Sequence, residues 1–109
     1  MIDRMDRINS QVQEIVSRFF NEHRDLFLPV ILTITQVMVT RDLQHCQVWV
    51  GAVGAMNETE LKKKLENLRR DLQSEIGDKV TFKFTPIVEF IIDHSGEKAQ
   101  HIEELLKEK

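Results

Sequence analysis

The sequence predicts a single α+β domain in the order α-β-β-α-β-α, with a three-stranded mixed sheet and helices packed on one face. Two observations carry this prediction. Apolar residues recur at three- and four-residue steps in some stretches, as on one face of a helix, and alternate with polar residues in others, as in strands. The 109 residues, 41% hydrophobic and 30% charged, suit one domain spanning 1–109.

The first predicted element is a helix that ends before Pro29. Its apolar residues form one stripe at helical spacing, and polar residues take the other positions. Proline disfavours helical backbone in the residue before it, which sets the limit. The stripe consists of Met5, Ile8, Val12, Ile15, Val16, Phe19 and Phe20.

Two strands follow, over 30–39 and 46–50, and the polar pair Arg41 and Asp42 predicts a turn between them. We expect the strands to form an antiparallel hairpin. In the second strand the inward side chains are predicted to be Cys46, Val48 and Val50, with Gln47 and Trp49 pointing outward.

The first strand changes phase once. Leu32 and Ile34 alternate with polar neighbours, and so do Val37 and Val39, but one residue out of step. A β-bulge at 35–36 would place all four side chains on the core face.

A second helix is predicted after Asn57, which forms a potential capping box with Glu60. Gly77 fits the left-handed position just past the end of this helix. The helix carries an apolar stripe of Leu61, Leu65, Leu68, Leu72 and Ile76.

A third strand is predicted around Pro86. Its inward residues are Val80, Phe82 and Phe84, then Val88, Phe90 and Ile92, and its outward residues are Lys79, Thr81 and Lys83. Asp93 or Ser95 is expected to cap a last helix. That helix would carry Ala99, Ile102, Leu105 and Leu106.

The motifs of catalysis are absent from the sequence. It has no glycine-rich phosphate loop, no nucleophile elbow and no metal-binding helix motif, so we expect no enzyme activity, metal or cofactor. The single Cys46 is interpreted as a buried structural thiol in a reducing compartment. No apolar run approaches the ~18 residues of a membrane helix, and no signal peptide is evident. These features predict a cytoplasmic protein.

Positive charge is concentrated in one part of the chain. The formal net charge is −3, but residues 61–83 hold seven basic and four acidic side chains. Such a surface can position RNA phosphates. The candidate RNA-binding residues are Lys62, Lys63, Arg69, Arg70, Lys79 and Lys83, with Arg41 at the hairpin turn. The alternative, which the charge pattern alone favours, is a solvated helix face with ordinary ion pairs.

Trp49 is the only tryptophan and is predicted to point away from the core face of its strand. Three roles are open for it: stacking on a base, packing under a loop or helix, or contacting a partner protein.

Taken in order, these segments resemble the ribosome-binding factor A family from about Arg7 to Leu106. The resemblance rests on the order and spacing of several short stretches. They are Val39-Thr40-Arg41-Asp42-Leu43 followed by Cys46-Gln47-Val48-Trp49-Val50, then Ile76-Gly77-Asp78-Lys79, Phe84-Thr85-Pro86, Phe90 with Asp93 and Ser95, and His101-Ile102-Glu103-Glu104-Leu105-Leu106.

The resemblance implies a type II KH-like fold and a cytoplasmic assembly factor without catalytic activity or cofactor. Members of this family bind 30S precursor particles and 16S rRNA, assist maturation and 5′-end processing, and are linked to cold adaptation. A late-assembly GTPase releases them in bacteria that have one. We expect this chain to be a monomer without membrane contact.

The family's Ala-x-Gly kink falls at Leu68, Arg69 and Arg70, where both the alanine and the glycine are missing. This departure predicts either a straighter helix or a kink without glycine, with the two arginines contacting phosphate instead. It also favours a rival hypothesis, a KH-like protein-interaction module that dimerises through its open sheet and does not bind RNA.

Overall fold

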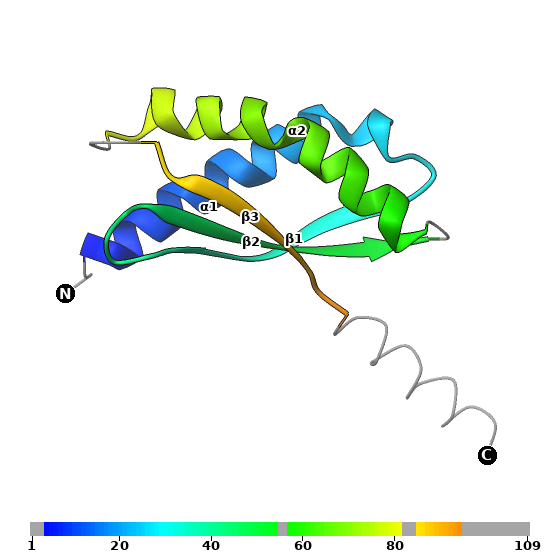
Figure 1. Cartoon of the computed structure of the whole chain (residues 1–109), viewed down its shortest axis with the longest axis horizontal. Coiled ribbons are helices and arrows are strands. Elements are labelled where there is room, and N and C mark those ends of the chain that lie inside the picture. Colours follow the sequence, from blue (N-terminus) through cyan, green and yellow to red (C-terminus); the bar gives the residue numbers. More distant parts are fainter. Residues whose placement is uncertain (1–3, 55–56, 82–84, 95–109) are drawn as a thin grey trace, which may run out of the picture.

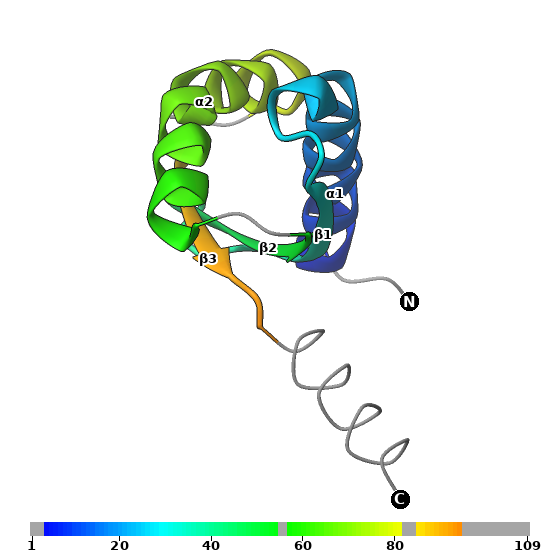
Figure 2. The ribbon, with the colours of Figure 1, turned by 90° about the vertical axis from the view of Figure 1, so that its right-hand side faces the viewer.

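The computed structural model describes residues 4–54, 57–81 and 85–94. Its elements follow in the order α1 (Arg4–Glu22), the short 3-10 helix η1 (Arg24–Leu26), β1 (Ile31–Val39), β2 (His45–Val53), α2 (Glu58–Lys79) and β3 (Ile87–Ile92). The sheet order is β1-β2-β3, antiparallel between β1 and β2 and parallel between β2 and β3. Both helices lie on the same side of the sheet, so the predicted α+β architecture is confirmed (Figures 1 and 2).

The apolar stripe of α1 faces the core, as its periodicity predicts: it is buried from Val12 to Phe20 and partly buried at Met5 and Ile8. Phe20 is the central residue of this contact, because its ring lies 5.9 Å from Phe90 of β3, 6.2 Å from Phe27 and 5.4 Å from Phe19. Edge-on and tilted aromatic pairs of this kind contribute about 0.5–1.5 kcal/mol each beyond the apolar area they bury. One side chain therefore connects α1, β3 and the segment after η1.

The bulge predicted in β1 is present. The register with β2 shifts between Ile34 and Gln36, and Val37 and Val39 are buried while Leu32 and Ile34 pack against the core. An extra residue in one strand reverses the alternation, which lets the whole strand face one core.

The start of α2 follows the prediction in part. Asn57 caps it, because its Oδ1 accepts the Thr59 N–H at 2.8 Å. Within the described residues no return bond from Glu60 completes the capping box. The stripe from Leu61 to Ile76 is buried.

The end of α2 corrects two predictions. The helix runs through Gly77 to Lys79, and extended backbone at Val80 ends it. A Cβ on Gly77 would lie 2.7 Å from Thr85 Oγ1, so the close approach of this side chain, and not a left-handed turn, explains glycine here.

The third strand begins later than predicted. It starts at Ile87, so Val80 is buried outside a strand and Lys79 belongs to a helix. The inward alternation of Val88, Phe90 and Ile92 is confirmed. The expected positions Phe82, Lys83 and Phe84, and the predicted last helix, lie outside the described residues.

Candidate nucleic-acid interface

Helix α2 carries five of the predicted RNA-binding residues: Lys62, Lys63, Arg69, Arg70 and Lys79. Arg41 is exposed in the turn between β1 and β2. Figure 1 places this turn at the same end of the molecule as the C-terminal end of α2, while the first turns of α2 lie at the opposite end. Lys83 lies outside the described residues.

Three of these cations are paired with carboxylates of the same helix. Lys62 Nζ lies 3.9 Å from Glu58, Arg69 2.7 Å from Glu66, and Lys79 2.9 Å from Glu75. Pairs of this spacing on an exposed helix contribute about 0.2–0.5 kcal/mol each. The alternative interpretation, a solvated helix face with ordinary ion pairs, therefore applies to three of the six predicted cations that the structure describes.

Lys63 and Arg70 differ from these three. Both are exposed, and neither has an ion pair within the described part of the chain. They are seven residues apart, which places them on one helix face about 10 Å from each other along the axis. Asn67 and Ser74 lie on the same face and are also exposed. We call Lys63, Asn67, Arg70 and Ser74 the open stripe of α2, since it holds two positive charges and no carboxylate.

Lys64, next to Lys63, is not part of this stripe. Its Nζ donates a 2.8 Å hydrogen bond to the Leu26 carbonyl, the last residue of η1. The bond fixes the short 3-10 helix to α2, so this lysine is structural.

The middle of α2 borders a shallow hollow of about 550 Å³ beside the first residue of β3. Its lining is mostly polar and includes Arg69, Arg70 and Gln73, but also the carboxylates of Glu66 and Asp71. At residues 68–70 the helix is unbroken, and Figures 1 and 2 show that α2 changes direction near its middle. Of the two alternatives at this position, the bend without glycine is the one observed.

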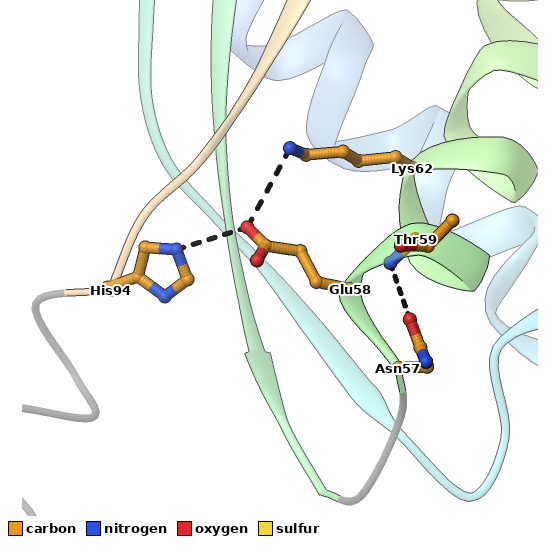
Figure 3. A network of polar contacts seen from close by, with 5 residues as sticks. All are labelled: Asn57, Glu58, Thr59, Lys62 and His94. Atoms are coloured by element: carbon orange, nitrogen blue, oxygen red, sulfur yellow. Dashed lines mark hydrogen bonds and ion pairs between the residues drawn. The ribbon is translucent and has the colours of Figure 1, made fainter.

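A second polar cluster joins the start of α2 to the end of β3. Glu58 Oε1 lies 3.2 Å from His94 Nε2 and 3.9 Å from Lys62 Nζ, beside the Asn57 cap (Figure 3). Next to it, Thr35 Oγ1 donates to Asp93 Oδ2 at 2.6 Å. These bonds hold the chain where it leaves the sheet.

Trp49 lies half-buried on the open face of the sheet, between Gln36 and Ile91 of the neighbouring strands. Helix α1 packs on the opposite face of the sheet, so the prediction that Trp49 packs under the N-terminal helix is wrong. The predicted last helix lies outside the described residues, and packing under that helix or a loop, stacking on a base and contact with a partner protein stay predictions.

The thiol of Cys46 is fully buried, as predicted, and burial raises its pKa to about 12. A thiol with that pKa is protonated at neutral pH and does not act as a nucleophile. Neighbouring His45 is exposed on the other face of β2. Among the described residues no three His, Cys, Asp or Glu side chains are grouped to hold a metal ion. No helix in the described part of the chain is long and apolar enough to span a membrane.

Residues 4–106 match the family model described as Ribosome-binding factor A. The chain belongs to this family. Curated relatives named ribosome-binding factor A include that of Acetivibrio thermocellus, 32% identical over 98% of this chain and 89% of the relative. The protein from Clostridium botulinum strain Hall is 36% identical over 94% and 88%.

Solved structures of ribosome-binding factor A share the fold. The crystal structure from Thermus thermophilus has a TM-score of 0.69 at 22% identity, covering 83% of this chain and 97% of that one. The solution structure of a Thermotoga maritima protein, titled a putative ribosome-binding factor A, has a TM-score of 0.62 at 18% identity over 78% and 82%. These neighbours support the KH-like α+β prediction.

Proposed function

We propose that this protein is a non-catalytic ribosome assembly factor. It binds 30S precursor particles and 16S rRNA and assists maturation and 5′-end processing of the rRNA. The family membership supports the first part of this proposal. A further structural neighbour, with a TM-score of 0.65 over 81% of this chain and 93% of its own, is titled a Thermus thermophilus ribosome-binding factor A model fitted into the map of a 30S complex.

The observation that carries the RNA contact is the open stripe of α2. Lys63 and Arg70 stand on one exposed face without carboxylate partners among the described residues, so phosphates meet two uncompensated charges there. Lys62, Arg69 and Lys79 join the interface by exchanging weak intrahelical pairs for phosphates. Arg41 and Lys83 complete the proposed set.

The proposal also covers where the factor works, its oligomeric state and its cofactor need. The factor works in the cytoplasm as a monomer, needs no cofactor, and holds RNA in position without changing it chemically. Its release by a late-assembly GTPase and its contribution to growth in the cold are part of the proposal.

The proposal is tested by co-sedimentation with precursor and mature small subunits. The double variant Lys63→Glu/Arg70→Glu should lose most of its binding to the precursor, because each change reverses a phosphate contact. Arg4→Glu/Arg7→Glu on exposed positions of α1 is the matched control, with the same change in net charge. Equal binding of both double variants, with folding preserved, would remove the open stripe of α2 from the interface.

A second candidate function is a protein-interaction module that does not bind RNA. The outer face of the sheet favours it, because Met38 is 44% exposed and lies diagonally across the β1–β2 ladder from Trp49. Such a module would form a stable dimer and ignore ribosomal RNA. Sedimentation velocity with and without precursor rRNA separates the two functions.

A further inference from the structure

The outer edge of the sheet at β1 is only partly closed. Val39 N–H points away from β2 and donates to Asn9 Oδ1 of α1 at 2.7 Å. In an antiparallel pair, successive residues direct their backbone groups alternately toward and away from the partner strand. The Thr40 N–H donates to the carbonyl of His45 at 2.9 Å, so Thr40 directs its backbone groups toward β2. By the register, every residue of β1 opposite an odd-numbered residue of β2 does the same, and those opposite even-numbered residues point away.

This alternation leaves Leu32 and Ile34 with outward backbone groups, because they lie opposite Ala52 and Val50. Val50 O accepts from Asp93 on the β3 side, which confirms the direction at that register. No hydrogen bond from the rest of the described chain reaches the outward N–H and C=O groups of Leu32 and Ile34. The first half of β1 is therefore an unpaired edge.

A groove of about 750 Å³ adjoins this unpaired edge. It lies between the last turns of α1, η1 and residues 31–34. Its floor includes the buried Phe20 and Phe27, and at its rim Leu28 and Ile31 are 58% and 63% exposed. The groove thus combines free hydrogen-bonding groups on one wall with an apolar floor.

From this combination we infer that the groove binds an extended segment of a partner protein, which adds a strand to β1. An added strand supplies a donor and an acceptor to Leu32 and to Ile34, and every second side chain falls on the apolar floor. A helix would not serve, because its own backbone groups are already paired. The site is separate from the proposed RNA interface on α2.

The groove does not suit the two other occupants of an open edge. RNA finds no surplus of positive charge, since Arg24 on the lining is accompanied by Asp25. A second copy would have to bring its own β1 edge into the groove, but α1 flanks that edge and holds it at Val39. A free polypeptide segment has neither obstacle.

The test is an NMR titration of the full chain with a synthetic ten-residue peptide of alternating valine and threonine, with lysine at both ends. We expect the amides of Leu32 and Ile34 to shift and to gain protection from exchange. The same peptide N-methylated throughout keeps its side chains but loses its donors, so it should not bind. No response at Leu32 and Ile34, or equal binding of the methylated peptide, would overturn the inference.

Two variants of α1 sharpen the test. Ser17→Arg fills the groove from an exposed position and should weaken peptide binding at least about tenfold. Gln13→Arg, also exposed on α1 but outside the groove lining, should bind as the parent does. Equal affinities for the two folded variants would contradict the assignment. Protection of the Leu32 and Ile34 amides from exchange before peptide is added would also overturn the inference. If this protection depended on protein concentration, a second copy would occupy the edge; if not, residues of the same chain would.

Discussion

Gln73 of α2 accepts the backbone N–H of Val88 on its Oε1 at 2.8 Å, so a helix side chain closes the outer edge of β3. Val88 lies opposite Cys46, and its N–H points away from β2. Asn9 does the same for Val39 on the other edge of the sheet. Open strand edges promote association with other chains, and here an amide from each helix accepts one outward N–H on each edge.

Removing the Gln73 acceptor should destabilise the fold. Gln73→Ala leaves the part-buried Val88 N–H without a partner, and an unsatisfied buried donor costs about 1–3 kcal/mol. Urea denaturation measures the loss. Gln73→Glu retains an acceptor oxygen of similar reach and should lose less; a loss equal to that of alanine would show that the hydrogen bond is not the cause.

Gly77 should not tolerate alanine, although alanine is the better helix former by about 1 kcal/mol. The new Cβ would lie 2.7 Å from Thr85 Oγ1 and 3.4 Å from its Cγ2. We expect Gly77→Ala to cost about 1–2 kcal/mol of unfolding free energy as strain.

Thr85→Ala removes both contacting atoms and leaves only Cβ, at an ordinary 3.6 Å. In that background Gly77→Ala should become neutral or stabilising. A double-mutant cycle by thermal unfolding checks this, and additive effects would refute the contact.

The β1–β2 turn predicts a pH dependence. The Thr40 hydroxyl donates to Asp42 Oδ1 at 2.6 Å and the Gln44 N–H at 3.0 Å, and together they hold the pKa of Asp42 below its ordinary value of 3.8. A carboxyl with a lowered folded-state pKa stabilises the fold fully above its unfolded value, and this contribution disappears as pH falls through the folded value.

An NMR titration of the Asp42 carboxyl should therefore give a midpoint under 3.8. Thr40→Val removes the larger cause and should raise the midpoint toward 3.8. An unchanged midpoint in this variant would show that the Thr40 hydroxyl is not the main cause of the lowered pKa.

The first helix, the hairpin and its bulge could be predicted from the sequence because they depend on local periodicity. The end of α2 could not, since Gly77 is explained by a contact with Thr85 that arises only in the tertiary structure. The start of β3 was also missed, since Lys79 belongs to α2 and Val80 and Thr81 lie between the helix and the strand, although all three fit a strand pattern. Asn9 and Gln73 gave no signal, as each acts on a strand far along the chain.

The candidate interface also has features that the sequence could predict and features that it could not. Sequence spacing placed the cations on α2, but it could not distinguish those paired with carboxylates from those left free. Lys62 and Arg69 have carboxylate partners on the helix, and Lys63 and Arg70 have none among the described residues.

This difference yields a prediction about salt. Affinity for precursor rRNA should fall less steeply with salt in the variant Lys63→Gln/Arg70→Gln. The magnitude of the slope of log affinity against log salt concentration should decrease by about 1.4–1.8, since each phosphate contact contributes about 0.7 on single strands and 0.9 on duplex. Lys62→Gln/Arg69→Gln removes the same formal charge from adjacent positions of the same helix. Its effect should be smaller, because Glu58 and Glu66 already compensate these two cations at 3.9 and 2.7 Å.

Filter binding at several salt concentrations measures both slopes. Equal reductions would mean that the intrahelical pairs dissolve at no cost on binding, and a larger reduction for Lys62 and Arg69 would move the interface to the neighbouring face of α2.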